Sequence, residues 1–161
     1  MTPTLTGLAP ILSSSVRLLV LGSFPSLASL AAQQYYGHPR NQFWLILGVL
    51  WGMDMHKMTD VQKRGIVVSK GLGIWDVYQS CERQGSLDCA IEKPVLNDLA
   101  WVQTQCPALA AIAHNGGESY RHHRITAALG LPVYRLPSSS PANASWSLEK
   151  KIDAWRAVFS L

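Results

Sequence analysis

A short segment, residues 34–44 with the sequence QYYGHPRNQFW, contains the residue types from which a binding site for a flat molecule can be built. It holds four aromatic rings, one amide (Asn41) and a single side chain of certain charge (Arg40). Aromatic faces bind flat rings by stacking, and an amide carries both a hydrogen-bond donor and an acceptor, so it can orient a water molecule. Aromatic residues are equally typical of a hydrophobic core. The segment therefore indicates either core or a slot for a flat ligand.

The elements that would position this segment form an alternating pattern. Three apolar runs, at residues 16–24, 109–117 and 131–145, each read as a buried strand that ends in a polar loop. Apolar residues three or four positions apart predict helices over 43–50 and 148–159. Alternating strands and helices predict a parallel α/β fold, in which ligands bind beyond the carboxyl ends of the strands. We therefore expect the loops at 22–26, 114–117 and 137–143 to converge on one cleft.

The composition limits the class of protein. A chain of 161 residues, with 48% hydrophobic and 15% charged residues, predicts one globular domain spanning 1–161. No apolar run is long enough to span a membrane, and the N-terminal segment lacks the features of a secretory signal, so we expect a cytoplasmic protein. The formal net charge of +4 suits a polyanionic partner.

Several kinds of site are not supported by the spacing of their residues. Three cysteines, Cys81, Cys89 and Cys106, match no metal-ligand pattern and are interpreted as reduced structural thiols. The five histidines form no metal-binding signature, residues 71–76 (GLGIWD) lack the third glycine of a dinucleotide fingerprint, and GSFPS is not a serine-nucleophile turn. We therefore expect no metal and no cofactor.

Four motifs taken together resemble the uracil-DNA glycosylase superfamily, in particular its hypoxanthine (deoxyinosine) branch. They are VLGSFPS, YYGHPRNQFW, IAHNGGESY and LPSSSPANASWSLEK, and the resemblance covers about residues 16–160. It implies a three-layer α/β/α sandwich with a central, mainly parallel sheet. The chain is also similar to the mismatch-specific uracil glycosylases, which share the His-Pro-x-Asn-x-Phe-Trp stretch. Their first motif has an Asn where this chain has Phe24, which argues against strong uracil excision.

The resemblance implies an enzyme of DNA repair. It would be a monofunctional glycosylase that flips a deaminated base, most simply hypoxanthine, hydrolyses its N-glycosidic bond and leaves an abasic site in DNA, as a monomer without a cofactor. Asn41 would hold the attacking water, or would only cap a loop. Asn115 would read the base or share in positioning water, or would be an ordinary turn residue. Tyr36 would stack on the base, whereas Phe43 and Trp44 are interpreted as core.

The remaining site residues follow from the same resemblance. Gly22 and the backbone N–H groups of Ser23 and Phe24 would complete the base pocket. A Ser/Pro loop would enter the DNA, with its serines on phosphates and with Ala142 or Asn143 filling the gap left by the flipped nucleotide. The loop comprises Pro137, Ser138, Ser139, Ser140, Pro141, Ala142 and Asn143. Arg40 and the 121–124 segment (RHHR) would contact phosphates, although RHHR is also typical of a solvated helix face.

The sequence leaves open the roles of two aspartates and three alternative functions. Asp76 and Asp88 are interpreted as supporting structure. A mismatch-specific uracil glycosylase and a catalytically silent DNA-damage-binding domain are alternatives to the proposed enzyme. A small-metabolite-binding α/β domain is a more distant one, because it would need neither the net positive charge nor the Pro-stiffened loop.

Overall fold

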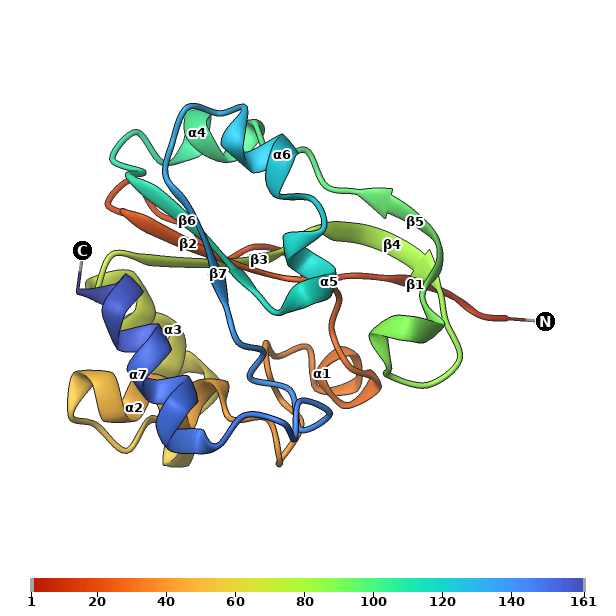
Figure 1. Ribbon diagram of the computed structural model, residues 1–161, viewed down its shortest axis with the longest axis horizontal. Coiled ribbons are helices and arrows are strands. Elements are labelled where there is room, and N and C mark those ends of the chain that lie inside the picture. The colour runs from red at the N-terminus through yellow and green to blue at the C-terminus, as the bar shows by residue number, and fades with distance from the viewer. Residues whose placement is uncertain (1, 161) are drawn as a thin grey trace.

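The centre of the molecule is a sheet of four parallel strands (Figure 1). The structure is a computed structural model, and it describes residues 2–160. Three of the strands are those expected from the apolar runs, and each is shorter than its run because the flanking residues lie in loops. Leu21 pairs with Trp75 on one side and with His114 on the other, which places this strand in the middle of the sheet. The strand order is β3 (Leu72–Asp76), β2 (Leu18–Gly22), β6 (Ala111–Asn115) and β7 (Val133–Leu136).

Helices cover both faces of this sheet and complete the three-layer α/β/α sandwich that the sequence predicted (Figure 1). Helices α6 and α7 both contact the edge strand β7. One face is covered by α2 (Phe43–Trp51), α3 (Asp60–Ser69) and α7 (Leu148–Phe159). The other is covered by α4 (Trp101–Gln105), α5 (Gly117–Tyr120) and α6 (His123–Ala127).

The strands contribute side chains to two hydrophobic cores, one on each face of the sheet, because successive side chains of a strand point to opposite faces. Val20 is fully buried in the core that contains Phe43 and Trp44, whereas Leu21 is fully buried in the core that contains Val102. The interpretation of Phe43 and Trp44 as core residues is confirmed, since they are 0% and 4% exposed. Burial on both faces explains why these strands read as continuous apolar runs.

Helix α7 anchors the chain that precedes it. The hydroxyl of Ser147 accepts a hydrogen bond from the N–H of Lys150 and caps the helix. Trp155 is fully buried, packs edge-on against Phe43 with ring centroids 5.6 Å apart, and donates from its indole nitrogen to the carbonyl of Pro137. The first residue of the Ser/Pro loop is therefore fixed to the core.

A second, antiparallel sheet was not predicted. It consists of β1 (Thr4–Thr6), β4 (Tyr78–Glu82) and β5 (Glu92–Leu96), in the order β1-β4-β5. Strand β5 is exposed throughout and carries Pro94, so it has no alternating apolar pattern. Strand β3 was not predicted either, because its short sequence, LGIWD, contains a glycine and ends in an aspartate. The loop between β4 and β5 contains the short 3-10 helix η2 (Asp88–Ala90).

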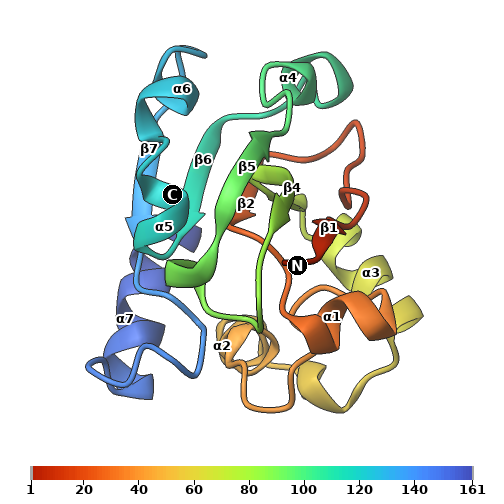
Figure 2. The ribbon, with the colours of Figure 1, turned by 90° about the vertical axis from the view of Figure 1, so that its right-hand side faces the viewer.

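Loops from distant parts of the chain meet at one end of the parallel sheet. In Figure 2, the segment around α1 (Leu27–Ala32), which follows β2, and the loop before α7 lie at the same end of the molecule. The 3-10 helix η1 (Met55–Lys57) connects α2 to α3. No helix within residues 2–160 is long and apolar enough to cross a membrane.

The three cysteines are free. Cys81 and Cys106 are buried, as expected for structural thiols, but Cys89 is exposed. The structural interpretation is therefore wrong for Cys89.

Candidate active site

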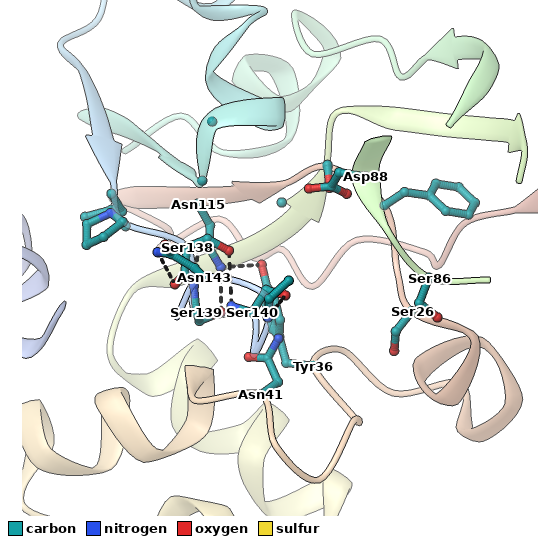
Figure 3. Close-up of a pocket in the computed structure, with 18 of the residues that line it drawn as sticks. Ser26, Tyr36, Asn41, Ser86, Asp88, Asn115, Ser138, Ser139, Ser140 and Asn143 are labelled. Carbon is teal, nitrogen blue, oxygen red and sulfur yellow. Dashed lines mark hydrogen bonds between the residues drawn. The ribbon is translucent and has the colours of Figure 1, made fainter. Parts of the chain in front are cut away.

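A cleft of about 750 Å³ opens at the carboxyl ends of the parallel strands. The three predicted loops converge on it, as Figure 3 shows for the labelled residues. The loop after β4 adds a fourth wall, with Ser86, Leu87, Asp88 and Cys89. Of the predicted site residues, Arg40, Pro141 and the 121–124 segment lie outside the lining, and these lie in it: Gly22, Ser23, Phe24, Tyr36, Asn41, Asn115, Pro137, Ser138, Ser139, Ser140, Ala142 and Asn143.

Gly22 lies where side chains from two other segments approach the backbone. A Cβ atom at this position would collide with Oδ1 of Asp76 and would lie 3.0 Å from the hydroxyl of Tyr36, so only glycine fits. The following turn is held by bonds from the N–H of Val77 to the carbonyl of Gly22 (2.8 Å) and from the N–H of Tyr78 to the carbonyl of Ser23 (3.1 Å). The turn is therefore rigid, which suits backbone N–H groups that are to serve as fixed donors.

Tyr36 is held by several contacts and has an unusual backbone conformation. Its φ of 52° is in the left-handed region, which a tyrosine seldom adopts. Its ring stacks on Phe43, with centroids 3.9 Å apart and planes 17° apart, and its hydroxyl accepts a 3.3 Å bond from Nδ2 of Asn115. Burial, followed by the charge of Asp76, raises the pKa of the Tyr36 hydroxyl, which therefore stays protonated. Strained residues of this kind cluster at functional sites.

Asn41 makes the capping bond that was considered as its alternative role. Its Oδ1 accepts a 2.9 Å bond from the N–H of Phe43, at the start of α2, and its own N–H donates to the carbonyl of His38. The side chain also lines the cleft, and among the described residues no acceptor is bonded to its Nδ2 group. The oxygen of the amide thus binds the first N–H of α2, and the nitrogen is available for a water molecule.

Asn115 is 8% exposed, and both ends of its amide are bonded (Figure 3). Nδ2 donates to the hydroxyls of Tyr36 (3.3 Å) and Ser139 (3.0 Å), and Oδ1 accepts from the N–H of Ser139 (3.0 Å). The side chain joins the end of β6 to the Ser/Pro loop. Only the second lone pair of Oδ1 remains for contact with a base.

The Ser/Pro loop is braced by its own side chains. Nδ2 of Asn143 donates to the carbonyl of Ser138, and the hydroxyl of Ser138 accepts from the N–H of Ser140. Ser139 is 1% exposed, and its hydroxyl accepts from Asn115. The prediction that the Ser139 hydroxyl contacts a phosphate is therefore wrong for this conformation, because a buried, bonded hydroxyl cannot reach the DNA backbone. Ala142 and Pro141 are exposed at the tip.

Two carboxyl groups in the cleft wall were not anticipated as site residues. Asp76, the last residue of β3, is 5% exposed, and Asp88 in η2 accepts a 2.7 Å bond from the hydroxyl of Ser23. Burial, followed by the charge of Asp88, raises the pKa of Asp76 to about 7. The interpretation of Asp76 and Asp88 as supporting structure is therefore incomplete, because both residues line the cleft. The available signal was the apolar run LGIWD, which ends in an Asp as LAAIAHN ends in an Asn.

The basic residues near the cleft differ in their contacts. In the RHHR segment, Arg121 pairs with Glu118 at 3.2 Å, and His122 shares a 2.9 Å hydrogen bond with the hydroxyl of Tyr78. This segment therefore resembles a solvated helix face more than a phosphate track. Arg135, which was not predicted, is exposed and lines the cleft. No group of three or more His, Cys, Asp or Glu residues within 2–160 could hold a metal ion.

Comparison with known proteins agrees with this architecture. Residues 9–159 match the family model described as the uracil DNA glycosylase superfamily. The chain is similar to a hypoxanthine DNA glycosylase of Methanosarcina acetivorans (33% identity) and to one of Methanosarcina barkeri (31% identity). Each similarity covers 95% of this chain and 96% of the relative.

A solved structure provides a third comparison. The solution NMR structure of a candidate uracil DNA glycosylase from Methanosarcina acetivorans superimposes with a TM-score of 0.89 at 32% identity, covering 98% of this chain and 97% of that one. The match of the family model to nearly the whole chain, on a fold with its cleft at the carboxyl ends of the parallel strands, shows that this chain belongs to the uracil DNA glycosylase superfamily.

Proposed function

We propose that the protein is a DNA glycosylase that removes hypoxanthine from deoxyinosine in DNA. The observation that carries the proposal is the similarity, over nearly the full length of both chains, to two relatives named hypoxanthine DNA glycosylase. The cleft of about 750 Å³ supports it, because such an enzyme must extrude its target base and enclose it. The whole chain, 1–161, would act as one domain and as a monomer.

The cleft offers a named group for each step of hydrolysis. The ring of Tyr36 and the bare backbone of Gly22 form walls against which a flat base can rest. The free Nδ2 group of Asn41 holds the attacking water at the sugar carbon, while its Oδ1 stays bonded to Phe43 and fixes the side chain. The N–H groups of Ser23 and Phe24 stabilise negative charge on the departing base.

The DNA partner is bound mainly through its backbone. The net charge of +4, the exposed Arg135 at the cleft and the exposed Arg40 favour phosphate contacts that are sensitive to salt and independent of sequence. The exposed tip of the Ser/Pro loop, at Pro141 and Ala142, enters the space left by the flipped nucleotide.

Water is the only nucleophile in this proposal, which makes the enzyme monofunctional. No lysine is among the cleft-lining residues of the described chain, so no amine there can form a Schiff base with the sugar. Borohydride added during the reaction should therefore trap no covalent protein–DNA adduct. An efficient adduct would show that an amine attacks.

The test uses duplexes that each carry one inosine, uracil, xanthine or ethenocytosine, followed by alkaline cleavage of abasic sites. We expect cutting at inosine, weaker or absent cutting at uracil, and no effect of a chelator. Binding to inosine DNA without any abasic product would support the catalytically silent binder instead. Product from none of the four duplexes would refute the enzymatic proposal.

A further inference from the structure

Asp76 has a surrounding that is unusual for a carboxyl group. Its Oδ2 atom is buried and has no hydrogen-bond partner among residues 2–160. Its Oδ1 atom lies over the backbone of Gly22, in the space that a Cβ atom there would fill. Gly22 is a wall of the proposed base pocket and Asp76 lines the same cleft, so a base that rests against Gly22 would lie beside this oxygen. A buried polar group without a partner is destabilising, and it persists where function requires it.

The neighbours of Asp76 favour its neutral form. From η2, the negative charge of Asp88 opposes ionisation of Asp76. The hydroxyls of Tyr35 and Tyr36 approach from the segment between α1 and α2. Burial raises the pKa of both hydroxyls, so they stay neutral. From β7, Arg135 lines the same cleft, but no ion pair joins Asp76 to any cation of the described chain. With a pKa of about 7, Asp76 carries a proton in a large fraction of molecules at neutral pH.

We infer that the carboxyl group of Asp76, through Oδ1, donates a proton to a ring nitrogen of the departing purine, N7 or N3, as the glycosidic bond breaks. The inference rests on the proposed glycosylase function and names a catalytic residue for it. A positioned acid of this kind acts when it lies within hydrogen-bond reach of the atom it protonates.

The step balances with water as the only co-reactant. When the bond between C1′ and N9 breaks, its electron pair moves onto the base, and the proton from Asp76 neutralises that charge at N7 or N3. The base then leaves as neutral hypoxanthine. Water adds its oxygen to C1′ and releases one proton, and the Asp76 carboxylate takes up a proton before the next turnover.

This chemistry also selects among bases. Hypoxanthine attached through N9 has unprotonated nitrogens at N3 and N7, and xanthine has one at N7. Uracil attached through N1 has none, because its only other ring nitrogen carries a hydrogen. A proton donor at Asp76 therefore helps a purine to leave and gives uracil no ring nitrogen to protonate.

The first test is the pH profile of inosine excision, measured in single turnover with saturating enzyme from pH 5.5 to 9. Because the protonated carboxyl is the active form, the rate constant should be constant below about pH 7 and should fall about tenfold per pH unit above it. Asp76→Asn cannot give up a proton. At pH 6 it should be slower by about 10²- to 10⁴-fold, and its profile should be flat.

The matched control is Asp54→Asn, which removes an exposed carboxylate outside the cleft lining and should leave both rate and profile unchanged. Thermal unfolding of each variant shows that it is folded. A wild-type rate constant that is independent of pH, or that rises through pH 7, would overturn the inference, because the ionised form would then be as active or more so.

The second test changes the substrate instead of the protein and is measured first with the wild type. Duplexes with 7-deaza- or 3-deaza-deoxyinosine replace one ring nitrogen by carbon. The wild type should excise the analogue that lacks the accepting nitrogen far more slowly than it excises inosine. Asp76→Asn, which donates no proton, should excise that analogue and inosine at the same rate. Equal further losses in both proteins for both analogues would contradict proton donation. Absence of product from inosine with the wild type would instead defeat the glycosylase function itself.

Discussion

Asn115 binds Ser139 twice with a single amide, since its Oδ1 accepts from the Ser139 N–H at 3.0 Å and its Nδ2 donates to the Ser139 hydroxyl at 3.0 Å. Both side chains are buried. The pair joins the end of β6 to the loop that follows β7, and the carbonyl of Ser139 in turn accepts from the N–H of Gln42 just before α2. Three walls of the cleft are thereby held in one arrangement.

Removing this amide should loosen the cleft. Asn115→Ala leaves the buried N–H of Ser139 without an acceptor, and an unsatisfied buried group costs about 1–3 kcal/mol. Urea unfolding should show a loss of this size. Ser139→Ala is the control, because it removes one bond, that from Nδ2 of Asn115, and leaves the N–H of Ser139 bonded, so it should cost less, about 0.5–1.5 kcal/mol. If Asn115→Ala kept full stability and still lost inosine excision, the residue would act on the base rather than as a brace.

The stability of the protein should depend on pH through Asp76. Its pKa in the folded state, about 7, is above that of an unfolded Asp, so the folded state binds more protons between about pH 4 and pH 7. The free energy of unfolding should therefore fall as pH rises through this range, and the ionised carboxylate should destabilise the fold above it. The difference between the folded-state and unfolded-state pKa values of Asp76 corresponds to at most about 4 kcal/mol.

Asp76→Asn removes this dependence. The variant should unfold at higher urea concentration than the wild type at pH 8, and the difference should disappear near pH 4. Asp54→Asn, at an exposed site, should follow the wild type at both pH values. A wild type that is as stable at pH 8 as at pH 5, with no gain from Asp76→Asn, would show that the buried carboxyl is not held neutral.

Tyr36 should contribute to binding the flipped base. Tyr36→Ala removes the ring and should weaken binding to inosine DNA by about 1–3 kcal/mol, with little effect on undamaged DNA. Tyr36→Phe keeps the ring and loses only the bond from Asn115, so it should bind nearly as the wild type does. Fluorescence anisotropy with both duplexes measures the difference. Equal weakening on both duplexes would mean that Tyr36 supports the backbone rather than the base.

The parts of the fold that the sequence predicted are those buried on both faces. Val20 and Leu21 belong to different cores, so their strand has no polar position and reads as an apolar run. The antiparallel sheet gives no such signal. Its strand β5 is exposed along its whole length, and the pairing of β4 with β5 has register irregularities, so long-range pairing rather than local pattern defines it.

The site, like the fold, has parts that the sequence predicts and parts that it does not. Its three Asn- and Ser-bearing loops follow recognisable strands, and the cleft at their ends follows from the parallel topology. Asp76 does not follow from the sequence as a site residue, because the short strand that carries it, LGIWD, has no clear pattern. The burial of Ser139 could not be predicted either, since it depends on a contact with Asn115, 24 positions away in the sequence.

Asn41 allows helix capping and water positioning to be separated, because its two amide atoms have different surroundings. Asn41→Ser keeps an oxygen that can accept from the N–H of Phe43 but removes the amide nitrogen, so the free energy of unfolding should change little. Asn41→Ala removes both and should lose about 0.5–2 kcal/mol. If Nδ2 holds the water, both variants should excise inosine at least about 10²-fold more slowly in single turnover while still binding inosine DNA. If Asn41 serves only as a cap, Asn41→Ser should excise at the wild-type rate, and the water would then have to be held by another group of the cleft.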